Sequence, residues 1–545
     1  MERRYRRHAV ISRRKALRLL AGASAATVLV ACGNGGAVPN LTAPATTTAG
    51  APSPLAAGAT PSTVVGTPPV AALQLPNTTV AIPSGQVSLR MVDNSTNKAP
   101  FLNAVFAAYQ QKYPNVRITH DTLPAPEVAK VVPLGIQNGN AHDVFQLPPG
   151  ITAAQAVAQG WLHPLDDIIP DFAQWRAAFP PNSFFEGSNV FKGKTYTFPT
   201  DGNWGYDTFL FYNAEYMQRA GVDPQAKPLT WGEYRATARK ITAQGAGKYY
   251  GVMIEGGETA RFEAMVRNLA QMAGAVGGTS SGVTDLDWKT GHYLYASDQY
   301  LAVIELLLAL KADGSVFPGA LALNQNQARA QMAQGVTGMI LSGIYSLPFF
   351  LLQNPDFVYG VTSQPVPDNG VVAPWSYGPP SGLFWAYAQT KYPQIVGDLL
   401  AYIGSEAGQE AQIRLYDTPL PVRFPQANAQ GLFDPRMRKL FPLLDQQTRL
   451  GPNPVVRNPD VANVLIEQKP VTPNFGAIIQ GIYTGQIGDA KKAMQDLTDR
   501  ADKELERAIK AAQAKGAKAS RDDYVFPNWD HSKDYTDADY AALKK

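Results

Sequence analysis

The stretch Phe191–Thr242 reads FKGKTYTFPTDGNWGYDTFLFYNAEYMQRAGVDPQAKPLTWGEYRATARKIT. It contains two runs with the composition of β-strands, residues 194–198 and residues 208–212. Pro199 stops the first run, and the polar, glycine-broken segment between the runs has no apolar periodicity. We therefore predict two strands joined by a polar crossing.

Two helices are expected after the second strand. Residues 214–220 have a helical pattern that begins directly after Asn213. Further on, Pro228-Leu-Thr-Trp-Gly-Glu233 places a glutamate three residues after Thr230, which is the spacing of a capping box. Thr230 is therefore the predicted N-cap of the second helix.

This order of strand, proline, polar crossing, Tyr-Asn, helix, Pro-x-Thr-Trp-x-Glu and helix resembles the extracellular solute-binding proteins of ABC importers. The nearest branch is family 1, typified by maltose- and other sugar-binding proteins. Two further features resemble the family: Tyr113-Pro-Asn-Val116 between a helix and a strand, and a last long helix over residues 490–514. The resemblance covers most of residues 87–514, and its specificity comes from the order of the motifs rather than from any single one.

The resemblance implies a two-lobed α/β fold of the periplasmic-binding-protein type (type II). Each lobe would be a mainly parallel sheet flanked by helices, and a hinge beside the ligand cleft would join the lobes. The implied division is a signal peptide (1–31), a disordered tether (32–85), an N-terminal lobe (86–200 and 379–418), a C-terminal lobe (201–378 and 419–514) and a C-terminal tail (515–545).

The length of the chain predicts more than one domain, since about 100–200 residues make a domain. The chain has 545 residues, one cysteine and a formal net charge of +4. The first 31 residues carry eight Lys and Arg and one Glu, and removing their +7 from the total leaves −3. A mildly acidic body gives no electrostatic reason to expect a nucleic-acid partner.

The N-terminus has the pattern of an export signal. A basic segment precedes a short apolar run, residues 19–31, which is too short to cross a bilayer. Ser12-Arg-Arg-Lys-Ala-Leu-Arg18 resembles the twin-arginine motif, with Ala16 where phenylalanine is usual, so the general export route stays open. Leu29-Val-Ala-Cys32 resembles a lipobox, which implies lipidation of Cys32. An ordinary cysteine at the end of the signal is the alternative.

Beyond the signal, residues 33–85 are rich in Ala, Thr, Pro, Gly and Ser, and we expect them to be a disordered tether. We expect strands and helices to alternate through the body, with a glycine-rich loop at residues 274–282. The apolar run 336–352 is long enough to suggest a membrane span. Its glycines, serines and Pro348 favour a buried strand that turns into a helix.

A sugar presents hydroxyls at its edges and C–H groups on its faces, so its site needs amides, carboxylates and flat rings. The crossing offers four such side chains, Asp201, Asn203, Trp204 and Tyr206, with core packing as the alternative for the two rings. Three polar residues are placed at strand ends, where α/β sheets bind ligands: Asn94, Asp143 and Glu255. Each could instead cap a helix or face solvent.

The resemblance implies four more ligand contacts. Tyr345 stands where the family often has a tryptophan that stacks on the sugar, and a core role is its alternative. Trp375 and Tyr377 lie in a loop at a family ligand position, where neighbouring Gly and Pro residues are expected to expose them. Arg423 could pair with an anionic ligand or an interlobe acid, or lie on the surface. Two other tryptophans are interpreted as structural, Trp231 at a helix start and Trp385 in an apolar strand.

Enzyme motifs are absent or badly placed. No Gly-x-x-x-x-Gly-Lys-Ser/Thr phosphate loop occurs, and the six histidines lack His-Glu-x-x-His spacing. Gly278-Thr-Ser-Ser-Gly282 fits a nucleophile elbow formally, but it lies in the expected loop. A surface glycoside hydrolase stays open, with Asp166-Asp167 and Asp285-x-Asp287 as the close carboxylate pairs.

We therefore expect a non-enzymatic, lipid-anchored binding protein on the extracytoplasmic face of a bacterial membrane, in the periplasm or at the cell surface. It would be a monomer without cofactor or metal. It would bind a mono- or oligosaccharide by cleft closure and deliver it to an ABC permease. A non-sugar polar solute such as glycerol phosphate is the alternative within the class.

Overall fold

The computed structural model describes residues 73, 75–95, 98–179, 183–200, 206–275, 277–280, 283–378, 382–416 and 435–543. All of them belong to one compact unit of the chain, Pro68–Lys545. Two four-stranded sheets with helices packed on them form the two lobes of this α/β fold.

The first sheet has the order β13-β3-β1-β2. Its strands are β1 (Val87–Asp93), β2 (Val116–Thr122), β3 (Val144–Phe145) and β13 (Trp385–Ala386). β1 pairs in parallel with both β2 and β3, whereas β13 is antiparallel to β3 at the sheet edge. The predicted mainly parallel sheet is confirmed here, and the last strand returns from a distant part of the chain.

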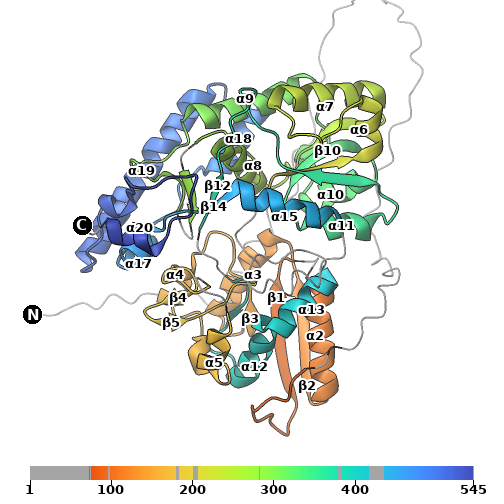
Figure 1. Cartoon of the computed structure of the whole chain (residues 1–545). Coiled ribbons are helices and arrows are strands. Elements are labelled where there is room, and N and C mark those ends of the chain that lie inside the picture. The colour runs from red at the N-terminus through yellow and green to blue at the C-terminus, as the bar shows by residue number, and fades with distance from the viewer. Residues whose placement is uncertain are drawn as a thin grey trace, which may run out of the picture. The chain divides into compact units, whose positions relative to one another are not determined.

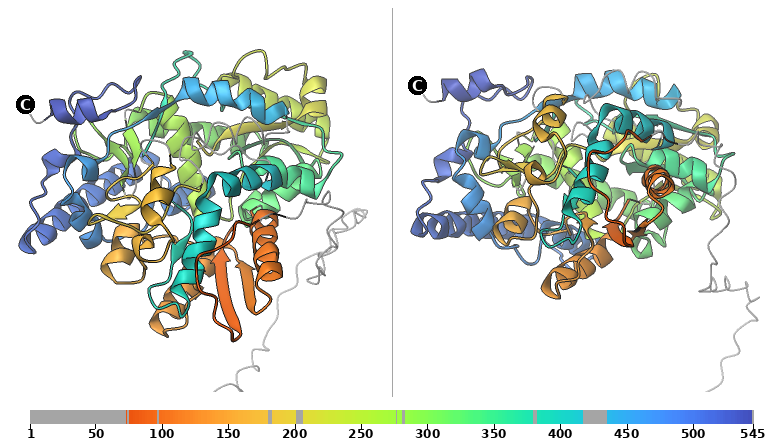
Figure 2. Two further views of the ribbon diagram at one scale, coloured as in Figure 1. Left: turned by 60° about the horizontal axis from the view of Figure 1, so that its bottom comes forward. Right: turned by 90° about the horizontal axis from the view of Figure 1, so that it is seen from below.

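Helices cover both faces of this sheet because apolar side chains of β1 point to both faces. Leu89 and Met91 point into a core with helix α2, while Val92 belongs to a core with α3 and α4 on the other face. The helices of this lobe are α2 (Ala99–Lys112), α3 (Ala125–Gln137), α4 (Ala153–Ala158), α5 (Phe172–Ala177), α12 (Pro393–Gly404) and α13 (Glu406–Tyr416). Figures 1 and 2 show α13 beside α2, and α12 packs against α13.

The second sheet has the order β11-β6-β10-β7. Its strands are β6 (Phe209–Asn213), β7 (Tyr250–Met253), β10 (Thr337–Ser342) and β11 (Tyr359–Thr362). β7, β10 and β11 run in one direction, but the reversed β6 stands between β10 and β11. Two of the three pairings are therefore antiparallel, so this sheet is more mixed than the sequence suggested.

The helices of the second lobe follow the predicted pattern closely. They are α6 (Ala214–Ala220), α7 (Trp231–Gly245), α8 (Thr259–Met272), α9 (Asp298–Ala312), α10 (Gln325–Ala333), α11 (Ser346–Gln353), α15 (Pro435–Gln447), α16 (Pro454–Arg457), α17 (Val461–Glu467), α18 (Phe475–Thr484) and α19 (Ala490–Ala514). Thr230 accepts a hydrogen bond from the Glu233 backbone and Glu233 from that of Thr230, so the predicted capping box is confirmed.

The apolar run at residues 336–352 is a buried strand followed by a helix, as predicted. Every residue of β10 is buried, and the chain turns at Gly343 before α11 begins. Among the described residues, no helix combines the length and apolar character that crossing a membrane requires.

Two expectations about irregular segments are wrong. Residues 75–85 are not free tether: Lys112 Nζ donates to the Leu75 carbonyl at 3.1 Å, and Asn115 Nδ2 donates to the Gly85 carbonyl at 2.8 Å. The expected glycine-rich loop is part of a hairpin of β8 (Gly277–Ser280) and β9 (Val283–Asp287). A glycine-rich sequence usually indicates a loop. Here the glycine-rich segment forms a strand because it pairs with β9.

The strand predicted at residues 194–198 is shorter than expected. β5 (Lys194–Thr195) forms a small hairpin with β4 (Val190–Phe191) and does not continue to residue 198. Phe198 is nevertheless fully buried and packs edge-on against Trp175, with the ring centroids 5.4 Å apart. The apolar residues that suggested a longer strand are therefore explained by packing in the core.

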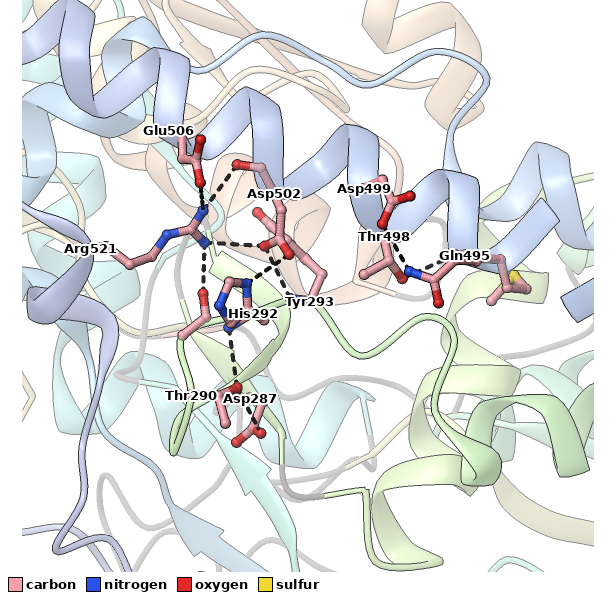
Figure 3. A network of polar contacts seen from close by, with 12 residues as sticks. Asp287, Thr290, His292, Tyr293, Gln495, Thr498, Asp499, Asp502, Glu506 and Arg521 are labelled. Carbon is pink, nitrogen blue, oxygen red and sulfur yellow. Dashed lines mark hydrogen bonds and ion pairs between the residues drawn. The ribbon is translucent and has the colours of Figure 1, made fainter. Parts of the chain in front are cut away.

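The C-terminal tail docks on the second lobe and on α19. Arg521 donates to Asp502 Oδ1 at 3.1 Å and to the Gly291 carbonyl at 2.7 Å, and His292 Nδ1 lies 2.8 Å from Asp502 Oδ2 (Figure 3). Further along, Phe526 packs edge-on against the buried Trp288 at 5.6 Å. The tail ends in a short helix, α20 (Asp537–Ala542). Its aromatic patch is therefore part of a hydrophobic core.

We expect Phe526→Ala to lower the free energy of unfolding by about 3–5 kcal/mol, because it removes a fully buried ring from close packing. Urea unfolding followed by circular dichroism measures the change. Leu352→Ala, at a position 58% exposed on α11, is the control and should change it by about 0.5 kcal/mol or less. An equally small effect at Phe526 would contradict a structural role for the tail.

Candidate ligand-binding site

The carboxyl ends of β1, β2 and β3 share one edge of the first sheet because these strands are parallel. Asn94 directly follows β1, as predicted, and its backbone N–H donates to Gln146 Oε1 at 3.1 Å. Gln146 directly follows β3. The structure thus brings Asn94 together with an amide side chain that the sequence analysis did not select.

The prediction that Asp143 ends a strand is wrong. Asp143 precedes β3 and lies beside Arg90 in the middle of β1, not at the strand ends where Asn94 is found. Its Oδ2 accepts the Arg90 backbone N–H at 2.8 Å, and its Oδ1 accepts from Thr390 Oγ1 at 2.6 Å. The carboxylate is used to fix neighbouring chain segments.

A cavity of about 350 Å³ opens beside the first-lobe edge. Its lining includes Gln146, Thr152 and Ser188 with apolar side chains of the first lobe, and Leu465 of α17 completes it. This volume lies within the roughly 300–1,000 Å³ that small-molecule sites occupy.

The second sheet presents a charged cluster at the corresponding edge. Glu255 follows β7, Ser342 ends β10, and Asp207 precedes the reversed β6, so the three lie together. Two arginines complete the cluster, Arg261 of α8 and Arg329 of α10. The sequence analysis missed both, since a charged residue within an amphipathic helix carries no mark of burial.

Glu255 is 3% exposed and all of its hydrogen bonds go to protein groups. Arg261 Nε donates to Oε2, Arg329 Nε donates to Oε1 at 2.9 Å, and Ser342 Oγ donates to Oε1 at 3.1 Å. Burial raises the pKa of Glu255. The two guanidinium groups and these hydrogen bonds lower it by more than burial raises it, so the pKa of Glu255 lies below the ordinary value. Glu255 is at the predicted strand end, where it holds the two arginines.

Tyr345 lies next to this cluster, at the start of α11. The Arg329 guanidinium stands over the Tyr345 ring, 4.6 Å from its centroid. Burial raises the pKa of Tyr345 to about 12 against the opposing effect of Arg261. The ring is half-buried beside the arginine.

Two predicted aromatic contacts are core residues. Tyr206 is 1% exposed, stacks on Phe209 at 4.3 Å and donates to Gln447 Oε1 at 2.7 Å. Trp375 is 6% exposed and donates from Nε1 to Asn268 Oδ1 at 3.1 Å. The expectation that neighbouring glycines and prolines expose Trp375 is wrong, because the chain there forms a strand and buries the ring.

That strand is β12 (Trp375–Tyr377), which pairs in parallel with β14 (Thr448–Leu450). Tyr377 is half-buried at its end, and its carbonyl accepts the Gly451 backbone N–H at 2.8 Å. Trp385 is 2% exposed, so its predicted core role is confirmed. The remaining predicted residues lie outside the described residues: Cys32, Asp201, Asn203, Trp204 and Arg423.

The carboxylate pairs considered for hydrolysis are engaged elsewhere. Asp166 Oδ2 accepts the Thr195 N–H at 2.7 Å, and Asp167 pairs with Lys194 at 3.0 Å. Asp285 is fully buried in β9 between Arg267 and Tyr300 rather than in a loop. Across the described part of the chain, no three His, Cys, Asp or Glu side chains are grouped as a metal site would require.

A sequence profile of the family described as bacterial extracellular solute-binding protein matches residues 93–410. This match covers more than half of the chain, including every strand of the second sheet and all of the first sheet except β1.

The chain belongs to the bacterial extracellular solute-binding proteins.

More distant relatives agree with this assignment. A binding protein of Brucella abortus (strain 2308) is 22% identical to this chain over 287 residues. These residues are 53% of this chain and 65% of that protein, so the chain spans less than two thirds of its length. A Brucella suis protein gives the same values.

Solved structures share the two-lobed fold. The GacH receptor of Streptomyces glaucescens, solved unliganded and with acarbose, has a TM-score of 0.58 at 18% identity, covering 77% of this chain and 98% of that one. An ABC transporter solute-binding protein of Thermotoga lettingae bound to α-D-tagatose has a TM-score of 0.57 at 18% identity, with 77% and 100% covered. An Agrobacterium radiobacter solute-binding protein in complex with ribitol has a TM-score of 0.56 at 17% identity, again with 77% and 100% covered.

We expect Glu255→Gln to lower the free energy of unfolding by about 3–5 kcal/mol at pH 7, because it leaves two buried guanidinium groups without their anion. The folded-state pKa of Glu255 lies below its ordinary value of 4.5. Its stabilisation is therefore present above pH 4.5 and lost as the pH falls through the lower folded-state value.

Urea titrations of both proteins between pH 7 and pH 3 measure this difference, which should shrink on the acid side. Glu215→Gln, which breaks the exposed pair with Arg219, is the matched control and should cost about 0–1 kcal/mol. A pH-independent difference would contradict the assigned ionisation.

Proposed function

We propose that this protein captures a mono- or oligosaccharide between its two lobes and delivers it to an ABC permease. The observation that carries the proposal is membership of the solute-binding family in a fold whose two sheets each present polar side chains at one edge. Ligand bound between the lobes contacts both, and only a closed state satisfies both sets of contacts.

A neutral, hydroxyl-rich ligand fits the charges at these edges. In the described part of the second-lobe edge, Glu255 is paired with two arginines, and Arg261 also lies 3.6 Å from Asp207. Amides at Asn94 and Gln146 and the ring of Tyr345 supply hydrogen bonds and an apolar surface. This balance favours a sugar over an anion such as glycerol phosphate. Acarbose, tagatose and ribitol are the ligands of the three similar structures.

The proposal includes placement and mode of action. We place the protein on the extracytoplasmic face of a bacterial membrane, exported by its N-terminal signal and anchored through lipid at Cys32. It acts as a monomer and without catalysis, since binding and release suffice for transport.

A thermal-shift screen of the protein tests this function with sugars, sugar phosphates, polyamines and peptides. A sugar at about 100 times its Kd should add roughly 2.7 kcal/mol to folded stability and remain unchanged on incubation. Consumption of the sugar, seen by chromatography, would establish hydrolysis instead. A shift with a phosphate ester alone would replace the sugar with an anionic solute, and no shift with any compound would remove the support for carbohydrate binding.

Tyr345 should act as an aromatic platform for the ligand. We expect Tyr345→Ala to weaken binding of the sugar found in that screen about tenfold, equivalent to about 1.4 kcal/mol, while Tyr345→Phe keeps most of the affinity. Isothermal titration calorimetry measures both. Tyr113→Ala, which removes a ring packed at a tilt against Tyr109 in the first lobe, is the control. Equal affinities for the alanine variant and the unmodified protein would assign Tyr345 to packing alone.

A further inference from the structure

A second cavity, of about 370 Å³, is lined by residues of both lobes outside the predicted site. Thr152 and Gln155 at the start of α4 form its first-lobe side. Glu263, Tyr293 and Phe475 are among the second-lobe residues opposite. Its volume is again that of a small-molecule site.

Aromatic rings form one wall of this cavity. Tyr293 and Tyr295 lie nearly parallel, with an interplanar angle of 8° and centroids 5.5 Å apart. Phe475 packs against Tyr295 at 4.8 Å, and both of these rings are buried. Tyr293 is only half-buried, so part of its ring faces the cavity. Such a wall suits the C–H face of a sugar ring.

Hydrogen-bonding groups surround the aromatic wall. Glu263 Oε1 accepts the Gly476 backbone N–H at 3.0 Å, while its Oε2 lies 3.8 Å from Arg267 Nη2 and keeps acceptor capacity. Gln468 Nε2 donates to Tyr293 Oη at 3.2 Å. Gln155 Nε2 from the first lobe donates to the Gln468 carbonyl at 3.4 Å, so the two lobes meet at this cavity.

The charges at the cavity favour a neutral ligand. Arg267 donates from Nε and Nη2 to the buried Asp285, both at 2.7 Å, and is therefore committed. Glu263 lies beside that arginine, which offsets its attraction for a cation. Lys469 also lines the cavity, but it is exposed, so solvent screens its charge. Neither an anion nor a cation finds a buried, uncompensated partner among these groups.

The cavity adjoins the one beside Gln146. Thr152 and Leu465 contribute to the lining of both. A ligand longer than one ring would have to pass these two side chains to extend from the first cavity to the tyrosine wall.

We propose that the cavity at Tyr293, Glu263 and Gln155 is a second carbohydrate subsite, and that the solute is an oligosaccharide of at least two sugar rings. This inference rests on the proposed sugar-binding function and names the ligand's size class. One ring occupies the cavity beside Gln146, and the next lies on Tyr293 with its hydroxyls on Glu263 and Gln468.

Calorimetry on the full-length protein tests the subsite with glucose, maltose and maltotriose, and with the corresponding mannose and galactose series. In one series, affinity should rise at least tenfold from the monosaccharide to the di- or trisaccharide. Tyr293→Ala and Glu263→Gln should each weaken trisaccharide binding at least tenfold, and more than they weaken monosaccharide binding. Circular dichroism and the unfolding temperature check that both variants are folded.

Two matched variants serve as controls. Tyr249→Ala removes a ring stacked on Tyr216 away from both cavity linings, and Glu215→Gln neutralises an exposed carboxylate. Both should leave trisaccharide affinity unchanged. The isosteric Glu263→Gln keeps the test decisive if Tyr293→Ala does not fold.

The failures of the two proposals are distinguishable. Sugars that bind with the same affinity at every length, or variants that weaken all lengths equally, would overturn the subsite and leave the sugar-binding function standing. If none of the sugars binds, both proposals fall.

Discussion

The binding edge of the second lobe depends on the burial of one carboxylate. Glu255 can stay ionised in the interior only because Arg261 and Arg329 approach it from two helices. Those contacts tie the end of β7 to α8 and α10, and Ser342 adds the end of β10. Arg329 in turn lies over Tyr345, so the same anion sets the position of the ring that we assign to the ligand. A compensated buried cluster gives this edge its shape without giving it a net charge.

A second buried network connects the hinge crossing to the C-terminal part of the chain. Tyr206 follows the crossing and is held by Gln447, the last residue of α15, while Trp375 is held by Asn268 of α8. Both rings pack together, with centroids 6.5 Å apart. Their hydrogen bonds satisfy polar atoms that would otherwise be costly to bury. These aromatics therefore stabilise the second lobe where it meets the hinge.

The fold could largely be predicted from the sequence because local patterns and packing agree. The helices at residues 214–220 and 490–514 have the predicted bounds, and the capping box at Thr230 forms as expected. The site was harder, since exposure depends on partners far along the chain. Trp375 is buried by pairing with Thr448, 73 positions later, which a run of glycines and prolines cannot reveal. Arg261 and Arg329 likewise reach the candidate site only through Glu255, and Tyr293 is placed by a bridge to Leu286 of the hairpin whose first part the sequence analysis took for a loop.

The tail gives the tyrosine wall its rigidity. Asp502 of α19 accepts a hydrogen bond from the Tyr293 backbone N–H at 3.3 Å. The same carboxylate contacts the neighbouring His292, and it binds Arg521, which belongs to the tail (Figure 3). These contacts fix the backbone that carries Tyr293. A pre-positioned ring loses little conformational entropy when a ligand stacks on it, so more of the contact energy appears as affinity. The tail forms no part of either cavity lining, so under the proposed subsite it would affect the ligand only through the position of Tyr293.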